Sequence, residues 1–259
     1  MDRIAQRRIQ RVDTRTGART ADRDPVIAEA ALTICARGRE AMVVMRTPGP
    51  SGEDAELVRG LLHAEGVADA VALAIRQVEA DVVEVDLDPA TLAPRALTST
   101  AACGVCGRAA IADLELRARE VAAEWTVGAA VIAGLPAALR ARQAAFDATG
   151  GLHAAGLFDR AGALRALRED VGRHNAVDKL VGWGLATGVD FAASILVLSG
   201  RLGYELAQKA VVAGVPVLAA VSAPTTLAID VCERFGVTAC GFVRDGRLNV
   251  YSHGHRVDP

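Results

Sequence analysis

The sequence predicts an α/β protein whose main sheet is largely parallel and is covered by helices on both faces. The last hundred residues alternate short apolar runs, typical of buried strands, with longer segments of helical pattern. Apolar residues make up 51% of the 259-residue chain and aromatic residues only 3%, so we expect a core of alanine, valine, leucine and isoleucine. A chain of this length can bury one large core or two smaller ones.

The first 24 residues differ in composition from the rest. They contain seven arginines and four aspartates with few apolar side chains, which predicts a disordered basic tail over residues 1–24. Arg7-Arg8 is similar to the start of a twin-arginine export signal, but no apolar stretch follows it. No stretch reaches the ~20 apolar residues of a membrane-spanning helix. The net charge of −2 does not favour nucleic acid or an anionic membrane as a partner.

The sequence predicts an N-terminal domain over residues 25–125, which ends with a cysteine-containing loop. A strand is expected at 41–45, before the breaker Arg46 to Pro50. A helix is expected at 53–64, because the acidic residues of its first turn complement the helix dipole. Residues 82–87 alternate like a strand, and 111–121 fit a strand or a helix equally well.

The sequence predicts a C-terminal domain over residues 126–259. The expected helix at 136–148 has proline at its start and Gly150-Gly151 past its end. The other expected elements are strands at 152–158, 164–169, 194–198, 215–222, 237–243 and 248–251, and helices at 174–183, 204–213 and 226–235.

Polar loops follow the three apolar strands of this domain. Ligands of such sheets bind at the carboxyl ends of the strands, and arginine forks bind phosphate oxygens in pairs. The loops therefore predict a site for a phosphate-bearing ligand, with ordinary solvated loops as the alternative. The candidate residues are Ser199, Gly200, Arg201, Ser222, Phe242, Val243, Arg244, Asp245, Gly246 and Arg247.

Residues 169–179 form the densest polar run of the chain. Within it, His174, Asp178 and Lys179 could move protons or bind anions at the mouth of a site. A capped helix start with a solvated charged face is the alternative reading.

Cys103 and Cys106 lie in a Cys-x-x-Cys loop among small residues, where the backbone can turn freely and leave a sulfur accessible. Five cysteines do not fit a secreted disulfide framework, so we expect a reducing, cytoplasmic setting. We interpret Cys35, Cys232 and Cys240 as core residues. A second ligand pair for structural zinc is then missing, and no metal site is expected.

The chemistry of the Cys103 loop leaves several functions open. A redox pair is one, and a zinc deaminase using His63, Glu65, Cys103 and Cys106 is another, although Ala102 stands where that signature has proline. A sulfur carrier is the third, because a thiolate on such a loop can accept sulfur from a donor persulfide and pass it on.

Over residues 29–251 the chain resembles the FdhD family, the sulfur-carrying accessory proteins of formate dehydrogenase. In this family the Glu65-Gly66 pair is typical but a preceding histidine is not, which disfavours the deaminase. The matching motifs lie at residues 45–49, 65–66, 103–107, 149–155, 169–179, 199–201, 214–217, 221–225 and 241–242.

The resemblance implies a sulfurtransferase with a C-terminal half that has a cytidine-deaminase-like three-layer α/β/α fold and lacks the zinc chemistry. Cys103 would receive sulfur from a cysteine desulfurase as a persulfide, with Cys106 as a second thiol. The acceptor would be the molybdenum bis(molybdopterin guanine dinucleotide) cofactor that formate dehydrogenase requires. A chaperone that binds this cofactor without carrying sulfur is the alternative.

The resemblance also implies a homodimer, and it assigns cofactor contacts to residues 242–247. Two positions depart from the family pattern, because Val243 and Asp245 stand where cysteine and proline are common. Arg244 and Arg247 keep the phosphate-binding chemistry. We expect His174 and Lys179 to lie near the cofactor pocket as orienting or proton-handling groups.

Overall fold

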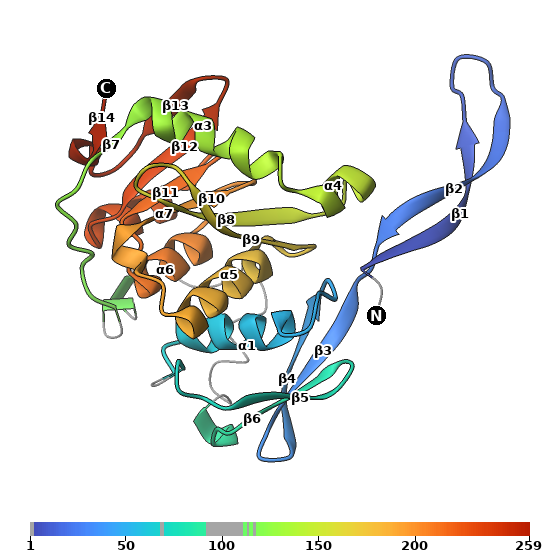
Figure 1. The fold of residues 1–259 in the computed structure, drawn as a ribbon, viewed down its shortest axis with the longest axis horizontal. Helices are drawn as coiled ribbons and strands as arrows, with labels where there is room; N and C mark the ends of the chain where they lie inside the picture. Colours follow the sequence, from blue (N-terminus) through green and yellow to red (C-terminus); the bar gives the residue numbers. More distant parts are fainter. Residues whose placement is uncertain (1–2, 68–69, 92–110, 113, 116–117) are drawn as a thin grey trace.

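The computed structural model describes residues 3–67, 70–91, 111–112, 114–115 and 118–259 (Figure 1). The N-terminal elements are β1 (Ile4–Val12), β2 (Arg19–Ile27), β3 (Ala30–Ala36), β4 (Arg39–Arg46), α1 (Glu53–Ala64), β5 (Ile75–Glu79), β6 (Val82–Val85) and the 3-10 helix η1 (Pro89–Thr91). The C-terminal elements are β7 (Val127–Gly128), α3 (Ala129–Arg140), α4 (Ala144–Thr149), β8 (His153–Asp159), β9 (Leu164–Asp170), α5 (Arg173–Thr187), η2 (Phe191–Ala193), β10 (Ser194–Leu198), α6 (Tyr204–Ala213), β11 (Val217–Ala220), α7 (Thr226–Arg234), β12 (Thr238–Arg244), β13 (Arg247–Val250), η3 (Gly254–Arg256) and β14 (Val257–Asp258). No described helix is long and apolar enough to cross a membrane.

The N-terminal segment is an ordered hairpin that projects from the body (Figure 1). β1 and β2 pair antiparallel from Ile4↔Ile27 to Val12↔Arg19. The prediction of a disordered tail over residues 1–24 is therefore wrong from Arg3 onward. The prediction rested on composition, which does not show the local order of the turn. There the Asp13 carboxylate accepts hydrogen bonds from the backbone N–H groups of Arg15 and Thr16.

β3 to β6 form a four-stranded sheet in the order β4-β3-β6-β5, with α1 on one face. Alternate residues of β3, such as Leu32 and Ile34, are buried on that face against Leu57 and Leu61 of α1. The helix predicted at 53–64 is confirmed at those bounds.

The C-terminal elements form a six-stranded sheet in the order β13-β12-β11-β10-β8-β9. β10–β11 and β11–β12 are parallel, whereas β10–β8, β8–β9 and β12–β13 are antiparallel. The prediction of a largely parallel sheet is thus wrong at both edges, where hairpins extend a parallel centre. The separate sheets fit an α/β protein of two parts, while the boundary at residues 125–126 stays a prediction.

Helices cover both faces of this sheet, which confirms the three-layer α/β/α arrangement. α5, α6 and α7 share one apolar core with the sheet, and α3 shares the other. The helix predicted at 136–148 is wrong, because α3 runs through Pro136 and α4 follows separately. Burial of Ile132, Leu135 and Leu139 against the sheet offsets the cost of the internal proline.

The two parts meet where α1 packs against α5. The backbones approach so closely that a Cβ on Gly60 would overlap the carbonyl of Asp178, and one on Gly182 would overlap that of Glu56. This contact holds the four-stranded sheet and its helix at a fixed position beside the start of α5.

Candidate active site at the strand ends

The predicted loops meet at one edge of the six-stranded sheet. The parallel strands β10, β11 and β12 all end there, at Leu198, Ala220 and Arg244, and Ser199 and Val221 directly follow the first two. β8 runs antiparallel to β10, so its first residue, His153, lies at the same edge, opposite Asp170 at the end of β9. Residues from five strands and from loops spread over more than ninety positions of sequence thus share one side of the molecule.

A pocket of about 640 Å³ opens at this edge, between the strand ends and the helices α3 and α4. Four of the predicted residues line it, namely Ser199, Val243, Arg244 and Asp245. The lining also includes Arg140, whose guanidinium pairs with Asp147, and the cavity is of a size that holds a small ligand.

The remaining predicted ligand residues do not line this pocket, and two of them, His174 and Lys179, lie in α5 and not on the strand-end loops. The full set is Gly200, Arg201, Ser222, Phe242, Gly246, Arg247, His174 and Lys179. Their roles in ligand binding stay predictions.

The end of β12 carries a strained backbone. Its pairing with β13 shifts register between Gly241 and Arg244, and Phe242 and Asp245 have φ values of 53° and 52°. Such a conformation is costly at Phe242 and is frequent at functional sites, whereas at Asp245 it is the ordinary geometry of the Asp245-Gly246 hairpin turn. A Cβ on Gly241 would come within 2.9 Å of Pro224 Cδ, so only glycine fits this close approach. The backbone of β12 therefore bends just before Arg244, which lines the pocket.

Three helices begin at this edge. α5 follows Gly172 and α6 follows Gly203, and in neither case does a side chain cap the helix start. α7 is capped by Thr225, whose hydroxyl accepts the N–H of Ala228 at 3.3 Å. Uncapped N–H groups and the positive ends of helix dipoles favour a bound anion.

His153 is a site residue that the sequence reasoning did not single out. It lines the pocket, and burial, followed by the positive charges of Arg173 and His174, lowers the pKa of its imidazole. A neutral ring can both donate and accept a hydrogen bond. The motif at residues 149–155 contained this histidine, but its strand position beside Ser199 was visible only in the fold.

His174 lies at the first turn of α5 and contacts the first turn of α6. Its Nε2 is 2.8 Å from Glu205 Oε2, and this hydrogen bond lowers the pKa of the Glu205 carboxyl. One turn further along both helices, Lys209 Nζ lies 2.6 Å from Asp178 Oδ1. Burial raises the pKa of Asp178, and its side chain is closed off from solvent, so it does not reach a ligand at the mouth.

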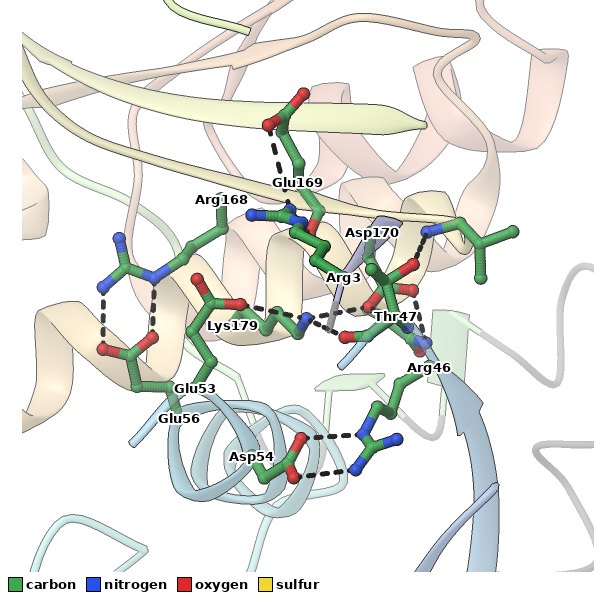
Figure 2. A network of polar contacts seen from close by, with 12 residues as sticks. Arg3, Arg46, Thr47, Glu53, Asp54, Glu56, Arg168, Glu169, Asp170 and Lys179 are labelled. Atoms are coloured by element: carbon green, nitrogen blue, oxygen red, sulfur yellow. Dashed lines mark hydrogen bonds and ion pairs between the residues drawn. The ribbon is translucent and has the colours of Figure 1, made fainter. Parts of the chain in front are cut away.

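Lys179 has a different position from the one expected. Its ammonium is fully buried between the two parts of the molecule, 2.9 Å from Asp170 Oδ2 and 3.2 Å from Glu53 Oε2 (Figure 2). It also donates to the carbonyl of Thr47 at 2.9 Å. Since these acceptors surround it, Lys179 anchors α1 and the end of β4 to α5, a structural position that differs from the orienting or proton-handling one expected near the cofactor pocket.

The same interface contains a further ion pair, in which Arg168 binds Glu56 through two hydrogen bonds of 2.6 and 2.7 Å (Figure 2). Next to it, within the N-terminal part, buried Arg46 of β4 binds Asp54 of α1. The paired charges make this contact specific as well as tight.

Cys103 and Cys106 lie outside the described residues, so their roles stay predictions. Cys232 and Cys240 are confirmed as core residues, because both side chains are fully buried. This burial raises the pKa of each thiol to about 12. Cys35 differs from the expectation, since it is half-buried on the face of β3 that points away from α1.

His63, a ligand in the deaminase alternative, lies far from the strand ends. Its Nε2 donates to the carbonyl of Val212 at 3.2 Å, near the last turn of α6, whereas the site lies at the first turn of that helix. Glu65 ends α1. Neither residue is among the described residues that line the pocket, and since Cys103 and Cys106 lie outside the described residues, the deaminase alternative stays an untested hypothesis.

Comparisons with known proteins agree over almost the whole chain. The model of the FdhD/NarQ family matches residues 27–258. The sulfur carrier protein FdhD of Streptomyces avermitilis is 42% identical over 282 residues, covering 99% of this chain and 97% of its own length. The protein of that name from Thermoplasma acidophilum is 43% identical, covering 84% and 79%.

One solved structure has the same fold. The crystal structure of a formate dehydrogenase accessory protein from Desulfotalea psychrophila aligns with a TM-score of 0.80, over 99% of this chain and 100% of the other, at 22% sequence identity.

Proposed function

Since the chain belongs to the FdhD/NarQ family, we propose that it is a sulfur carrier that serves formate dehydrogenase. The observation that carries the proposal is the match of nearly the whole chain to proteins named sulfur carriers. As in the sequence-based expectation, the donor is a cysteine desulfurase. The Cys103 thiolate attacks the outer sulfur of the donor's persulfide, the donor's S–S bond breaks, and the donor cysteine leaves as a thiolate.

The acceptor in this proposal is the molybdenum bis(molybdopterin guanine dinucleotide) cofactor, bound as substrate at the strand ends. Support comes from the pocket, from Arg244, which lines it, and from the uncapped starts of α5 and α6. Guanidinium groups and helix N-termini both bind phosphate groups such as those of a dinucleotide. The neutral imidazole of His153 can donate to or accept from the bound molecule.

We place this reaction in the cytoplasm, where thiols stay reduced, and in a homodimer, as the family resemblance implies. A second candidate is a chaperone that binds the cofactor and protects it without carrying sulfur. The pocket supports it, because the described residues that line it, such as Ser199 and Arg244, can bind a ligand without sulfur transfer.

Mass spectrometry after incubation with a cysteine desulfurase, its pyridoxal cofactor and free cysteine tests the carrier. We expect the peptide that contains Cys103 to gain the mass of one sulfur atom, and Cys103→Ala to abolish this gain and the support of formate dehydrogenase. Cys232→Ala, which changes a core thiol, is the control and should keep the gain. A Cys103→Ala protein that still supports formate dehydrogenase would favour the chaperone.

A further inference from the structure

Gln143 is a buried polar residue of the strand-end pocket. It lies between α3 and α4, is only 3% exposed and belongs to the pocket lining. Its backbone is held on both sides, because its N–H donates to the carbonyl of Arg140 at 3.2 Å and its carbonyl accepts the N–H of Asp147 at 2.9 Å. The fold therefore fixes the point from which the side chain starts.

The side-chain amide of Gln143 has no partner in the protein. Among the residues that the structure describes, none forms a hydrogen bond with it, and it does not cap α4. The buried side-chain atoms that are both unpaired and closed off lie elsewhere, in Arg3, Arg46 and Asp178. Since the amide is not closed off and its residue is almost fully buried, its remaining open side is the pocket.

An unpaired amide in such a place is unfavourable for the fold. A buried polar group that has lost water without gaining a hydrogen bond destabilises the native state. Gln208, a second buried glutamine, follows the usual rule, because its amide donates to the carbonyl of Ala64 at 3.4 Å. Gln143 is thus better explained by a ligand than by the fold.

The other lining residues indicate what kind of ligand this is. Pro136, Leu139 and Leu152 give the pocket apolar walls, which suit the faces of a flat ring. The amide of Gln143 offers one acceptor and one donor side by side. Arg244 borders the same pocket and can bind phosphate. The combination fits a ring that has a neighbouring N–H and carbonyl and is linked to phosphate.

We propose that the side chain of Gln143 binds the 2-amino-4-oxopyrimidine edge of the ligand. Its amide oxygen accepts the ring N–H, and its amide N–H donates to the adjacent ring carbonyl. Guanine has this edge, and so do the pterin rings of the cofactor. The inference rests on the cofactor proposed above as substrate, and it adds a binding residue about a hundred positions before the segment 242–247.

Isothermal titration calorimetry of the full chain with GDP and with pterin tests the contact. Gln143→Leu replaces the amide with an apolar group of similar size, so binding of the ring should weaken about tenfold or more. A loss for GDP alone assigns the contact to guanine, and a loss for pterin alone assigns it to the pterin rings. A loss for both shows that the amide binds either ring.

Urea denaturation of the ligand-free protein gives a second readout. Gln143→Leu removes an unpaired buried amide, so the midpoint of unfolding should rise. Gln208→Leu is the matched control, because this glutamine is buried and paired and does not line the pocket. Its midpoint should fall while its affinity for GDP and pterin stays that of wild type.

Three results would overturn the inference, and they have different meanings. If Gln143→Leu binds both probes as tightly as wild type, the amide does not contact the ring, and the cofactor site itself is unaffected. If the ligand-free Gln143→Leu protein unfolds at a lower urea concentration than wild type, the glutamine serves the fold. A wild-type protein that binds neither probe would also refute the proposed acceptor. Persulfide formation on Cys103 is measured separately and does not depend on these outcomes.

Discussion

Lys179 Nζ lies 2.9 Å from Asp170 Oδ2, and neither side chain has solvent-exposed surface. Asp170 also accepts the backbone N–H of Thr47 at 3.0 Å and that of Gly172 at 2.8 Å. One carboxylate thus joins the end of β4, the end of β9 and the turn before α5. The buried pair holds the start of α5, with His174, in position at the strand-end site.

Replacing Lys179 with methionine should destabilise the fold strongly. The change leaves the Asp170 and Glu53 carboxylates buried without their cation, which costs about 3–5 kcal/mol. Lys179→Met/Asp170→Asn removes both charges and should cost less than the single variant. Urea denaturation followed by circular dichroism measures both. A Lys179→Met protein as stable as wild type would show that the pair does not hold the two parts together.

The role of Lys179 could not be read from the sequence. The run at 169–179 was identified as unusual, but the partners Thr47 and Glu53 precede Lys179 by more than a hundred positions. By contrast, the strand at 194–198 and the helices at 53–64 and 204–213 were predicted at their observed bounds, because local apolar period and end signals determine them.

Part of the candidate site could also be predicted from the sequence. The strand-end rule located the loops of Ser199 and Arg244, since it needs only the order of strands. It could not include His153, because β8 runs antiparallel to β10 and brings its first residue to this edge. The hairpin was missed because its order comes from the Asp13 turn and from the backbone pairing of β1 with β2, and composition does not record either.

Alanine at Gly60 or Gly182 should separate α1 from α5. A Cβ at either position would overlap a backbone carbonyl, and overpacking of this kind costs about 1–3 kcal/mol. Gly134 in α3 is the matched control, because no atom lies within 4 Å of its Cβ position. Gly134→Ala should raise stability by about 0.5–1 kcal/mol through helix propensity. Thermal unfolding of the three variants compares them, and equal effects at Gly60 and Gly134 would contradict the close approach.

Arg244 and Arg247 should differ in their effect on ligand binding. Arg244 lines the pocket and Arg247, beyond the turn, does not. Loss of one charge-assisted hydrogen bond costs about 1.5–3 kcal/mol, so Arg244→Ala should weaken the binding of GDP about tenfold or more. Arg247→Ala is the control and should have a smaller effect. Isothermal titration calorimetry measures both with GDP, which has the same groups as the guanine nucleotide end of the proposed cofactor. A larger loss of affinity in Arg247→Ala than in Arg244→Ala would place the phosphate site on the outer side of the turn.

Stability should fall on mild acidification because of two histidines. Burial lowers the pKa of His63 and of His153 below the ordinary value of 6.5, so the unfolded chain binds more protons than the native protein near this pH. Stability therefore rises with pH in this range, is fully present above pH 6.5 and is lost as pH falls through the lowered pKa.

The variant His63→Gln should reduce this dependence on pH. Glutamine keeps a donor for the carbonyl of Val212 but does not titrate. Urea denaturation at about pH 7.5 and about pH 5.5 brackets the histidines, and comparing the variants with wild type separates their contribution from that of a carboxyl with a raised pKa, such as Asp178. The loss of stability between the two pH values should be smaller in His63→Gln than in wild type, and smaller again in His63→Gln/His153→Gln. Exposed His255→Gln is the control, and an unchanged loss in the double variant would assign the acid sensitivity to other groups.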